Sequence, residues 1–368
     1  MTNSKFSPLF SPFKCRSLQL RNRLIMAPMT RYFAPAGIPD SGVIDYYSRR
    51  AEGGVGLIVT EGVGIGRPAA VNNPMIPIFH GEEALDRWRA VAQSVHSKGA
   101  CIAPQLWHVG SAPDARGSGV PANPESPSGV FSPRQQLGHS MTETDIAETI
   151  DAFAEAARDA QRIGFDCIEF HGAHGYLIDQ FFWDVTNHRN DNYGGDAVRR
   201  LRFATELVRA VRSAVGPEMV LILRVSQWKQ QDYAARNANS PAELAAWLRP
   251  LTDAGVDIFH CSQRRLWEPE FDGSPLNLAG WAKKLTGCPT ISVGSVGLSG
   301  EFMDELRGKV RSERAHIDDV LERLDREEFD LVAVGRALIA DPEWAIKVQQ
   351  GREEEILPFR REDLGVLY

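Results

Sequence analysis

Cysteine is scarce in this chain of 368 residues, and the few that occur form no recognisable pair. The sequence contains no Cys-x-x-Cys spacing, which is common in zinc sites and in redox motifs. The odd count argues against a full set of disulfides, and cysteine in an apolar run behaves as a small hydrophobe. We therefore expect a cytoplasmic protein with no disulfide and no zinc site. The cysteines are Cys15, Cys101, Cys167, Cys261 and Cys288.

Long apolar runs and an excess of positive charge are also missing. No apolar run approaches the roughly 18 residues that a membrane helix needs. The opening stretch MTNSKFSPLF lacks a charged segment followed by an apolar one, so we expect no signal peptide. The net charge of −7 gives no basic surface for nucleic acid. We therefore expect neither a membrane nor a nucleic acid as a partner.

Short apolar runs alternate with amphipathic segments along the whole chain. The runs are bounded by turn residues, which is typical of parallel strands buried on both faces. We expect strands at 23–29, 56–65, 100–107, 165–170, 219–226, 256–262, 290–294 and 331–335. We expect helices at 40–53, 82–98, 142–163, 196–215, 240–254, 276–285, 301–326 and 336–350. This strict alternation predicts an α/β fold, a (β/α)8 TIM-type barrel that forms a single domain over residues 1–368.

Three segments lie outside this alternation or differ from it in composition. Residues 13–21 precede the first strand and predict a small N-terminal hairpin that caps the bottom of the barrel. The long loop 110–141 follows the third strand and is rich in proline, glycine and serine, so we expect a lid at the catalytic face. The heavily charged segment 301–326 predicts a solvated helix.

The residues most suited to chemistry follow the expected strands, at the end of the barrel where active sites lie. His171, His174 and Tyr176 come directly after the fourth strand. Imidazoles can hold a substrate oxygen, and a phenol can deliver a proton. Arg224 interrupts the apolar run VLILRVS, and a buried cation is costly unless it is paired. It either faces an anionic ligand or forms a buried ion pair with an acid such as Glu169.

Two glycine-rich runs, ISVGSVGLSG and VAVGRALIAD, follow the last two strands. Their backbone N–H groups would form the phosphate site that is common in such barrels. An alternative interpretation is a metal-dependent barrel hydrolase built on His171, His174 and His260, because closely spaced histidines also ligate metals. A carboxylate is missing after the last strand, where that alternative needs one. A third interpretation is a phosphate-binding barrel without redox activity.

The segment 170–195, FHGAHGYLIDQFFWDVTNHRNDNYGG, resembles the active-site segment HGAxGYLxxQFLxPxxNxRxDxYGG of the Old Yellow Enzyme family. The runs NRLIMAPMTRYFA, PQLWHVG and GRALIADPEW resemble other family segments in the same order. The run GGDAVRRLRF departs from the family's GGSxENRxRF, and Ser111 stands where the family often has arginine. The matches in the first segment are His171, Gly172, Ala173, Gly175, Tyr176, Leu177, Gln180, Phe181, Asn187, Arg189, Asp191, Tyr193, Gly194 and Gly195.

This resemblance implies an ene reductase, an FMN-dependent NAD(P)H oxidoreductase with tightly bound, non-covalent FMN and no metal. In the family's reaction, NAD(P)H passes a hydride to the flavin, which returns it to the β-carbon of an α,β-unsaturated carbonyl or nitro compound. His171 and His174 would hold the oxygen of this small electrophilic alkene. Tyr176 would protonate its α-carbon, and Tyr32 would also contact the substrate.

The resemblance also assigns residues to the flavin. Thr30 would contact the C4 carbonyl, Gln105 the pyrimidine edge, and Arg224 the N1 and O2 atoms, where a fixed charge stabilises the anionic reduced flavin. Thr30 together with Tyr32 combines features of two branches of the family, so the subclass stays open. The sequence also leaves open the natural substrate, the preferred nicotinamide and the choice between monomer and homo-oligomer. The expected cofactor-binding residues are Pro28, Met29, Thr30, Gly62, Gln105, Arg224, Gly294, Ser295, Gly297, Gly335 and Arg336.

Overall fold

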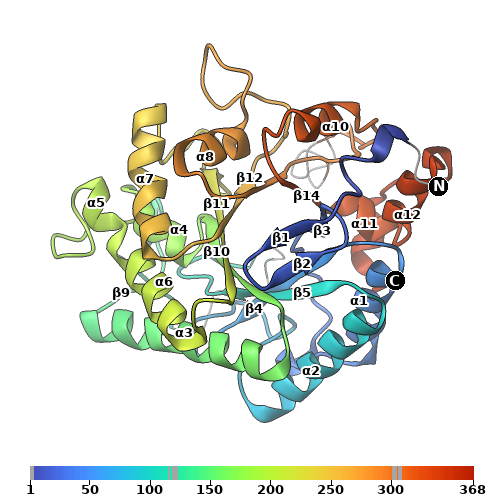
Figure 1. The fold of residues 1–368 in the computed structure, drawn as a ribbon. Coiled ribbons are helices and arrows are strands. Elements are labelled where there is room, and N and C mark those ends of the chain that lie inside the picture. The colour runs from blue at the N-terminus through green and yellow to red at the C-terminus, as the bar shows by residue number, and fades with distance from the viewer. Residues whose placement is uncertain (1–3, 115–116, 118–122, 301–304, 306–308) are drawn as a thin grey trace.

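The computed structural model describes residues 4–114, 117, 123–300, 305 and 309–368. Eight parallel strands close into a barrel, with helices packed around its outside (Figure 1). The predicted (β/α)8 architecture is therefore confirmed. The barrel strands, in their order around it, are β3 (Leu24–Met26), β4 (Leu57–Gly64), β5 (Cys101–Trp107), β10 (Cys167–His174), β11 (Val220–Lys229), β12 (Ile258–Ser262), β13 (Thr290–Val293) and β14 (Leu331–Val334). The helices are α1 (Ser41–Glu52), α2 (Glu82–Ser97), α3 (Glu143–Ile163), α4 (Leu177–Phe182), α5 (Ala197–Arg200), α6 (Arg202–Val215), α7 (Pro241–Ala254), α8 (Leu278–Thr286), α10 (Asp318–Asp325), α11 (Arg336–Ala340) and α12 (Trp344–Gln350).

Burial on both faces accounts for the apolar character of the strands. All eight residues of β4 are buried, and alternate residues along each strand point into the barrel or toward the helices. Val59 and Ile222 belong to the cluster inside the barrel, whereas Ile58 and Leu221 belong to the cluster that faces the helices. The barrel interior is thus a packed core of apolar side chains.

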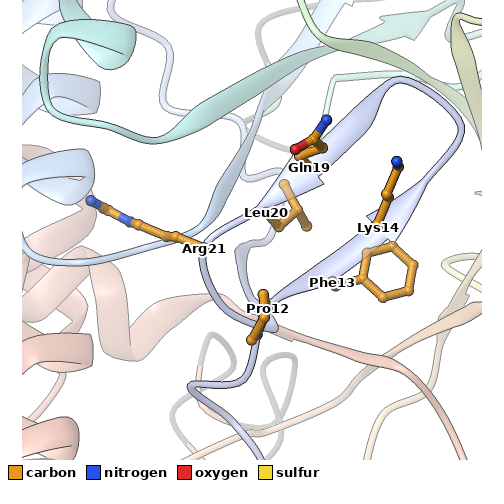
Figure 2. A pocket seen from close by; sticks show the side chains of 6 residues that line it. All are labelled: Pro12, Phe13, Lys14, Gln19, Leu20 and Arg21. Carbon is orange, nitrogen blue, oxygen red and sulfur yellow. The ribbon is translucent and has the colours of Figure 1, made fainter.

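The N-terminal hairpin closes the other end of the barrel. Strands β1 (Phe13–Cys15) and β2 (Leu18–Leu20) pair antiparallel, as expected for residues 13–21. Phe13, Leu18 and Leu20 pack against the interior cluster, so the hairpin acts as a plug over the barrel bottom. The hairpin also borders a pocket with a volume of about 380 Å³, whose lining side chains are shown in Figure 2. The pocket is lined by Pro12, Phe13, Lys14, Gln19, Leu20 and Arg21.

The predicted helices differ from the observed ones mainly near the C-terminus. Within the segment 301–326, only α10 is a helix of more than one turn among the described residues, and 301–304 and 306–308 lie outside them. Arg314 instead pairs with Leu298 in an extended bridge, which takes the backbone out of helical geometry. The segment 336–350 divides at Pro342, since proline cannot donate the hydrogen bond that would continue α11. Across the part of the chain that is described, no helix is both long and apolar enough to span a bilayer.

The described parts of the long loop 110–141 lie against the carboxyl ends of the barrel strands. It contains the short strands β6 (Glu125–Ser126), β7 (Val130–Ser132), β8 (Gln135–Gln136) and β9 (His139–Ser140), and residues 115–116 and 118–122 lie outside the described part. Arg67, which follows β4, makes two hydrogen bonds to Glu125, at 3.1 and 2.6 Å. Gln231, which follows β11, donates to the carbonyl of Phe131 at 3.1 Å. These contacts attach the loop to two sides of the barrel mouth.

Candidate active site

A cavity of about 570 Å³ lies at the carboxyl ends of the barrel strands. This is the face on which (β/α)8 enzymes place their sites, and the volume is in the range of small-molecule pockets. The predicted residues that line it come from six strands that are far apart in the sequence. They are Pro28, Met29, Thr30, Tyr32, Gln105, His171, His174, Tyr176, Arg224, Gly294, Ser295, Gly335 and Arg336.

Two of the expected cofactor-binding residues, Gly62 and Gly297, do not line this cavity. A Cβ atom on Gly62 would lie 2.4 Å from the indole of Trp107, so the glycine allows Trp107 to pack against β4. Gly297 has a φ of +72°, and its carbonyl accepts a hydrogen bond from Ala315 at 3.0 Å. The cofactor-binding role expected of these two glycines stays a prediction, and Val296 and Leu298, on either side of Gly297, do line the cavity.

His171, His174 and Tyr176 converge at the end of β10. The strand continues past Phe170 to His174, beyond the predicted end. The ring centre of His171 lies 5.1 Å from that of His174 and 4.8 Å from that of Tyr176. The Nδ1 atom of His171 is buried and has no hydrogen-bond partner, whereas Nε2 of His174 lies 2.8 Å from the hydroxyl of Ser262. The cavity therefore presents a pair of imidazoles and a phenol to one region of space.

Both histidines are neutral at ordinary pH. Burial, together with the nearby charge of Arg224, holds the pKa of His171 and of His174 well below the usual value. A neutral imidazole donates one N–H and accepts at the other nitrogen. The pair can therefore bind an oxygen by hydrogen bonding without adding positive charge to the cavity.

A buried ion pair holds the turn that carries these residues. His174 and Gly175 have φ values of 64° and 80°, a left-handed conformation that needs local support. The carboxylate of Asp179 accepts the Gly175 N–H at 2.8 Å, and its other oxygen lies 2.7 Å from the Lys229 ammonium. Both side chains are fully buried. Sequence reasoning missed this pair, although an isolated lysine at the end of an apolar run was a visible signal.

Arg224 is buried and, within the described part of the chain, forms no ion pair with Glu169 or with another acid, so the ion-pair interpretation is wrong. Glu169 instead lies 2.6 Å from Nδ1 of His260 and accepts a hydrogen bond from the Gln105 amide at 2.8 Å. The Nε atom of Arg224 is buried without a partner. A guanidinium that lines a cavity without an ion pair is a suitable group for an anionic or electron-rich ligand.

The histidines of the metal-dependent alternative do not come together as ligands. His171, His174 and His260 do not form a group whose ligand atoms lie within 4.8 Å of one another. Glu125, His139 and Asp145 do form such a group in the part of the chain that is described. Arg67 already occupies it, at 2.6 Å from Glu125 and 3.4 Å from Asp145.

The two glycine-rich runs meet at one corner of the cavity, as predicted. The Arg336 guanidinium donates to the hydroxyl of Ser295 at 3.2 Å and to that of Ser312 at 2.9 Å. It also forms an ion pair with Glu305 and donates to the Gly300 carbonyl at 2.7 Å. Sequence reasoning missed Glu305 and Ser312, which lie in the charged segment before α10.

A buried carboxyl group beside the cavity predicts a pH dependence of stability. Glu61 accepts the backbone N–H of Arg31 at 2.9 Å, and burial raises its pKa from 4.5 to about 7. Because the folded pKa exceeds the unfolded one, this group favours the folded state at low pH, and the contribution is lost as the pH rises through about 7.

We expect Glu61→Gln, which keeps an acceptor and removes the charge, to reduce the fall in unfolding temperature between pH 5 and pH 8. Thermal unfolding at both pH values measures this change. The exposed Glu52→Gln provides the matched control, since Glu52 is 65% exposed and should have little effect. An equal pH dependence in the wild type and in Glu61→Gln would contradict the expectation.

A family model described as "NADH:flavin oxidoreductase / NADH oxidase family" matches residues 8–300. This chain belongs to that family, the Old Yellow Enzyme family. The NADPH dehydrogenase of Bacillus cytotoxicus is 32% identical over 342 residues, which cover 91% of this chain and 90% of that protein. Members of the family are FMN-dependent and use NAD(P)H.

Other Old Yellow Enzyme relatives match over different lengths. The NADH oxidase of Thermoanaerobacter brockii is 36% identical over 363 residues, or 95% of this chain, but the chain spans only about half (52%) of that protein. The structure of morphinone reductase in complex with tetrahydroNAD superposes on this chain with a TM-score of 0.79 at 26% identity. The match covers 97% of this chain and 93% of the morphinone reductase chain. The 12-oxophytodienoate reductase 7 of Oryza sativa is 37% identical over 231 residues, which are 59% of this chain and 58% of that protein.

Proposed function

We propose that this protein is an FMN-dependent NAD(P)H oxidoreductase that reduces the activated C=C bond of α,β-unsaturated carbonyl or nitro compounds. One observation carries this function. A guanidinium that has no ion pair within the described residues, two imidazoles and a phenol line a single cavity at the catalytic end of the barrel. The cation can stabilise a cofactor that becomes anionic when it is reduced. The imidazoles can bind a substrate oxygen by hydrogen bonds, and the phenol can donate a proton to the substrate.

The residues of the cavity fit FMN. Arg224, whose buried Nε has no partner, would face the electron-rich edge of the isoalloxazine ring, and Gln105 would meet its pyrimidine edge. Glu169 holds the Gln105 amide at 2.8 Å, so the orientation of that amide is set before a ligand binds. Thr30, Ser295 and the other lining residues named above would complete the site. When bound, FMN supplies the hydride transfer, from NAD(P)H and then to the electron-poor carbon of the substrate.

The side chains of the protein would perform the remaining chemistry. His171 and His174 donate hydrogen bonds to the substrate oxygen, which polarises the C=C bond and stabilises the negative charge that develops there. Tyr176 gives its phenolic proton to the α-carbon as the substrate accepts the hydride at the β-carbon. The O–H bond breaks, a C–H bond forms, and the phenolate is protonated again from solvent.

The names of the relatives support a carbonyl substrate. Morphinone and 12-oxophytodienoate both carry a ketone group by name, and they are reduced by proteins similar to this chain. The tetrahydroNAD complex of morphinone reductase supports a nicotinamide as the reductant.

Purified protein provides the test of this function. The protein should be yellow, should release FMN on denaturation, and should oxidise NADH or NADPH when 2-cyclohexenone or a nitro-olefin is present. A colourless protein that does not bind added FMN would overturn the function. Stoichiometric zinc together with hydrolase activity would replace it with the metal-dependent alternative.

Arg336 is expected to anchor the FMN phosphate, and Glu305 to compete with that phosphate for the same guanidinium. A charge-assisted hydrogen bond contributes about 1.5–3 kcal/mol, so Arg336→Ala should weaken FMN binding about tenfold or more. Glu305→Gln removes the competing anion and should strengthen FMN binding. Fluorescence titration of the apoprotein with FMN measures both affinities. The opposite changes in FMN affinity expected for the two variants serve as the control, because a general disruption of the structure around Arg336 would weaken binding in both.

A further inference from the structure

The ring of Tyr176 is held in one position by its neighbours. It packs edge-on against Trp107, with ring centres 4.8 Å apart and planes at 84°, and edge-on against His171. Its backbone N–H donates to the carbonyl of Ala173 at 3.3 Å, and Gln180 donates to the carbonyl of Gly175 at 2.7 Å. The phenolic oxygen therefore has a fixed place in the cavity, and only the direction of its O–H bond is left to be set.

A glutamine on the extension of β11 contacts that oxygen. The amide Nε2 of Gln230 lies 2.7 Å from the hydroxyl of Tyr176. The backbone of the same residue donates to the carbonyl of His174 at 3.4 Å, so the extension is tied directly to the catalytic turn. Gln230 is exposed at the edge of the cavity that it helps to line. Gln230 therefore contacts Tyr176 by a hydrogen bond from the solvent-exposed edge of the cavity, and it is not part of the packed core.

The direction of this hydrogen bond decides where the phenolic proton points. An amide nitrogen only donates, so the phenolic oxygen accepts from Gln230 and cannot direct its own hydrogen there. Within the described residues, the structure gives the Tyr176 hydroxyl no second hydrogen-bond partner. Its hydrogen is therefore available to a molecule in the cavity.

We propose that Gln230 is a positioning residue for the general acid Tyr176: its amide holds the phenolic oxygen so that the phenolic hydrogen points at the substrate. This role rests on the proposed ene reductase function and adds a residue to it. The same bond also stabilises the phenolate that remains after proton transfer, so it lowers the pKa of Tyr176 and opposes the increase caused by burial. Gln230 would thus orient the phenolic proton of Tyr176 toward the substrate and would also make its transfer more favourable.

The test uses the FMN-loaded enzyme and rapid-mixing measurement of each half-reaction. Gln230→Met keeps the length of the side chain and removes the donor, so reduction of 2-cyclohexenone should slow about three- to tenfold, the effect expected for one hydrogen bond. Reduction of the bound flavin by NAD(P)H should remain near the wild-type rate. In a Tyr176→Phe background, Gln230→Met should have no further effect, because the phenol through which it acts is gone. Equal slowing in both backgrounds, or no slowing in the wild-type background, would overturn the role of Gln230.

Gln230→Glu provides a second readout that a purely structural role would not move. An ionised carboxylate only accepts, so it would take the phenolic hydrogen away from the substrate. Enone reduction should therefore be slower than in Gln230→Met at pH 8 and should recover on acidification toward pH 5. A pH profile equal to that of Gln230→Met would overturn the positioning role. Wild-type enzyme that fails to reduce any enone would overturn the function itself, and this outcome is visible before any variant is made.

Discussion

Tyr176→Phe should slow the enone half-reaction by about 10²–10⁴-fold, which is the loss expected when a general acid is removed. The substitution keeps the ring that packs on Trp107 and His171 and deletes only the hydroxyl. The phenol stays protonated at neutral pH, because burial raises its pKa further above 10. Rapid-mixing measurement of flavin reoxidation by 2-cyclohexenone gives the rate directly.

Two comparisons separate proton donation by Tyr176 from packing. Reduction of the bound flavin by NAD(P)H needs no proton from Tyr176 and should remain near the wild-type rate. With strongly activated nitro-olefins, the rate of hydride transfer should fall less in the variant, because the nitronate that forms is stable and can be protonated later by solvent. Enone reduction within a few-fold of wild type would mean that the proton comes from another group.

Lys229→Met should lower the stability of the protein by about 3–5 kcal/mol, which is the usual cost of removing one partner from a buried ion pair. The Asp179 carboxylate would be left buried without its cation, 2.7 Å from the position that the ammonium had occupied. Asp179 also accepts the Gly175 N–H, so the turn that carries His174 should loosen at the same time. The unfolding midpoint in urea measures the loss.

A double variant and a surface control test the cause of this loss. Adding Asp179→Asn to Lys229→Met removes the stranded charge and keeps an acceptor for Gly175, so part of the stability should return. Lys98→Met breaks an exposed pair with Glu52 and should change the midpoint little. Similar losses in the two lysine variants would contradict the importance of the buried pair.

The apolar–polar pattern of the sequence was sufficient to predict the barrel strands but not to predict every helix. Each of the eight strands was predicted within a few residues, because a strand buried on both faces is a continuous apolar run bounded by turn residues. Residues 309–317 belong to the segment 301–326, which was predicted as a solvated helix from its charged composition. The bridge between Leu298 and Arg314 and the hydrogen bonds around Ser312 replace that helix. These are tertiary contacts, and they override local helix propensity.

The sequence alone determined which residues gather at the site. Parallel strands of a closed barrel all end on one face, so His171, Arg224 and Arg336 had to meet once the eight strands were recognised. Only the tertiary structure decided how they are paired. Glu169 lies with His260 and Gln105 and leaves Arg224 to the cavity, and Gln230 reaches Tyr176 from 54 residues away. Such pairings depend on strand register, on bulges and on side-chain rotamers, which set distances to within an ångström. An apolar–polar pattern records which side a residue faces, and it carries no information about which polar neighbour that residue will meet there.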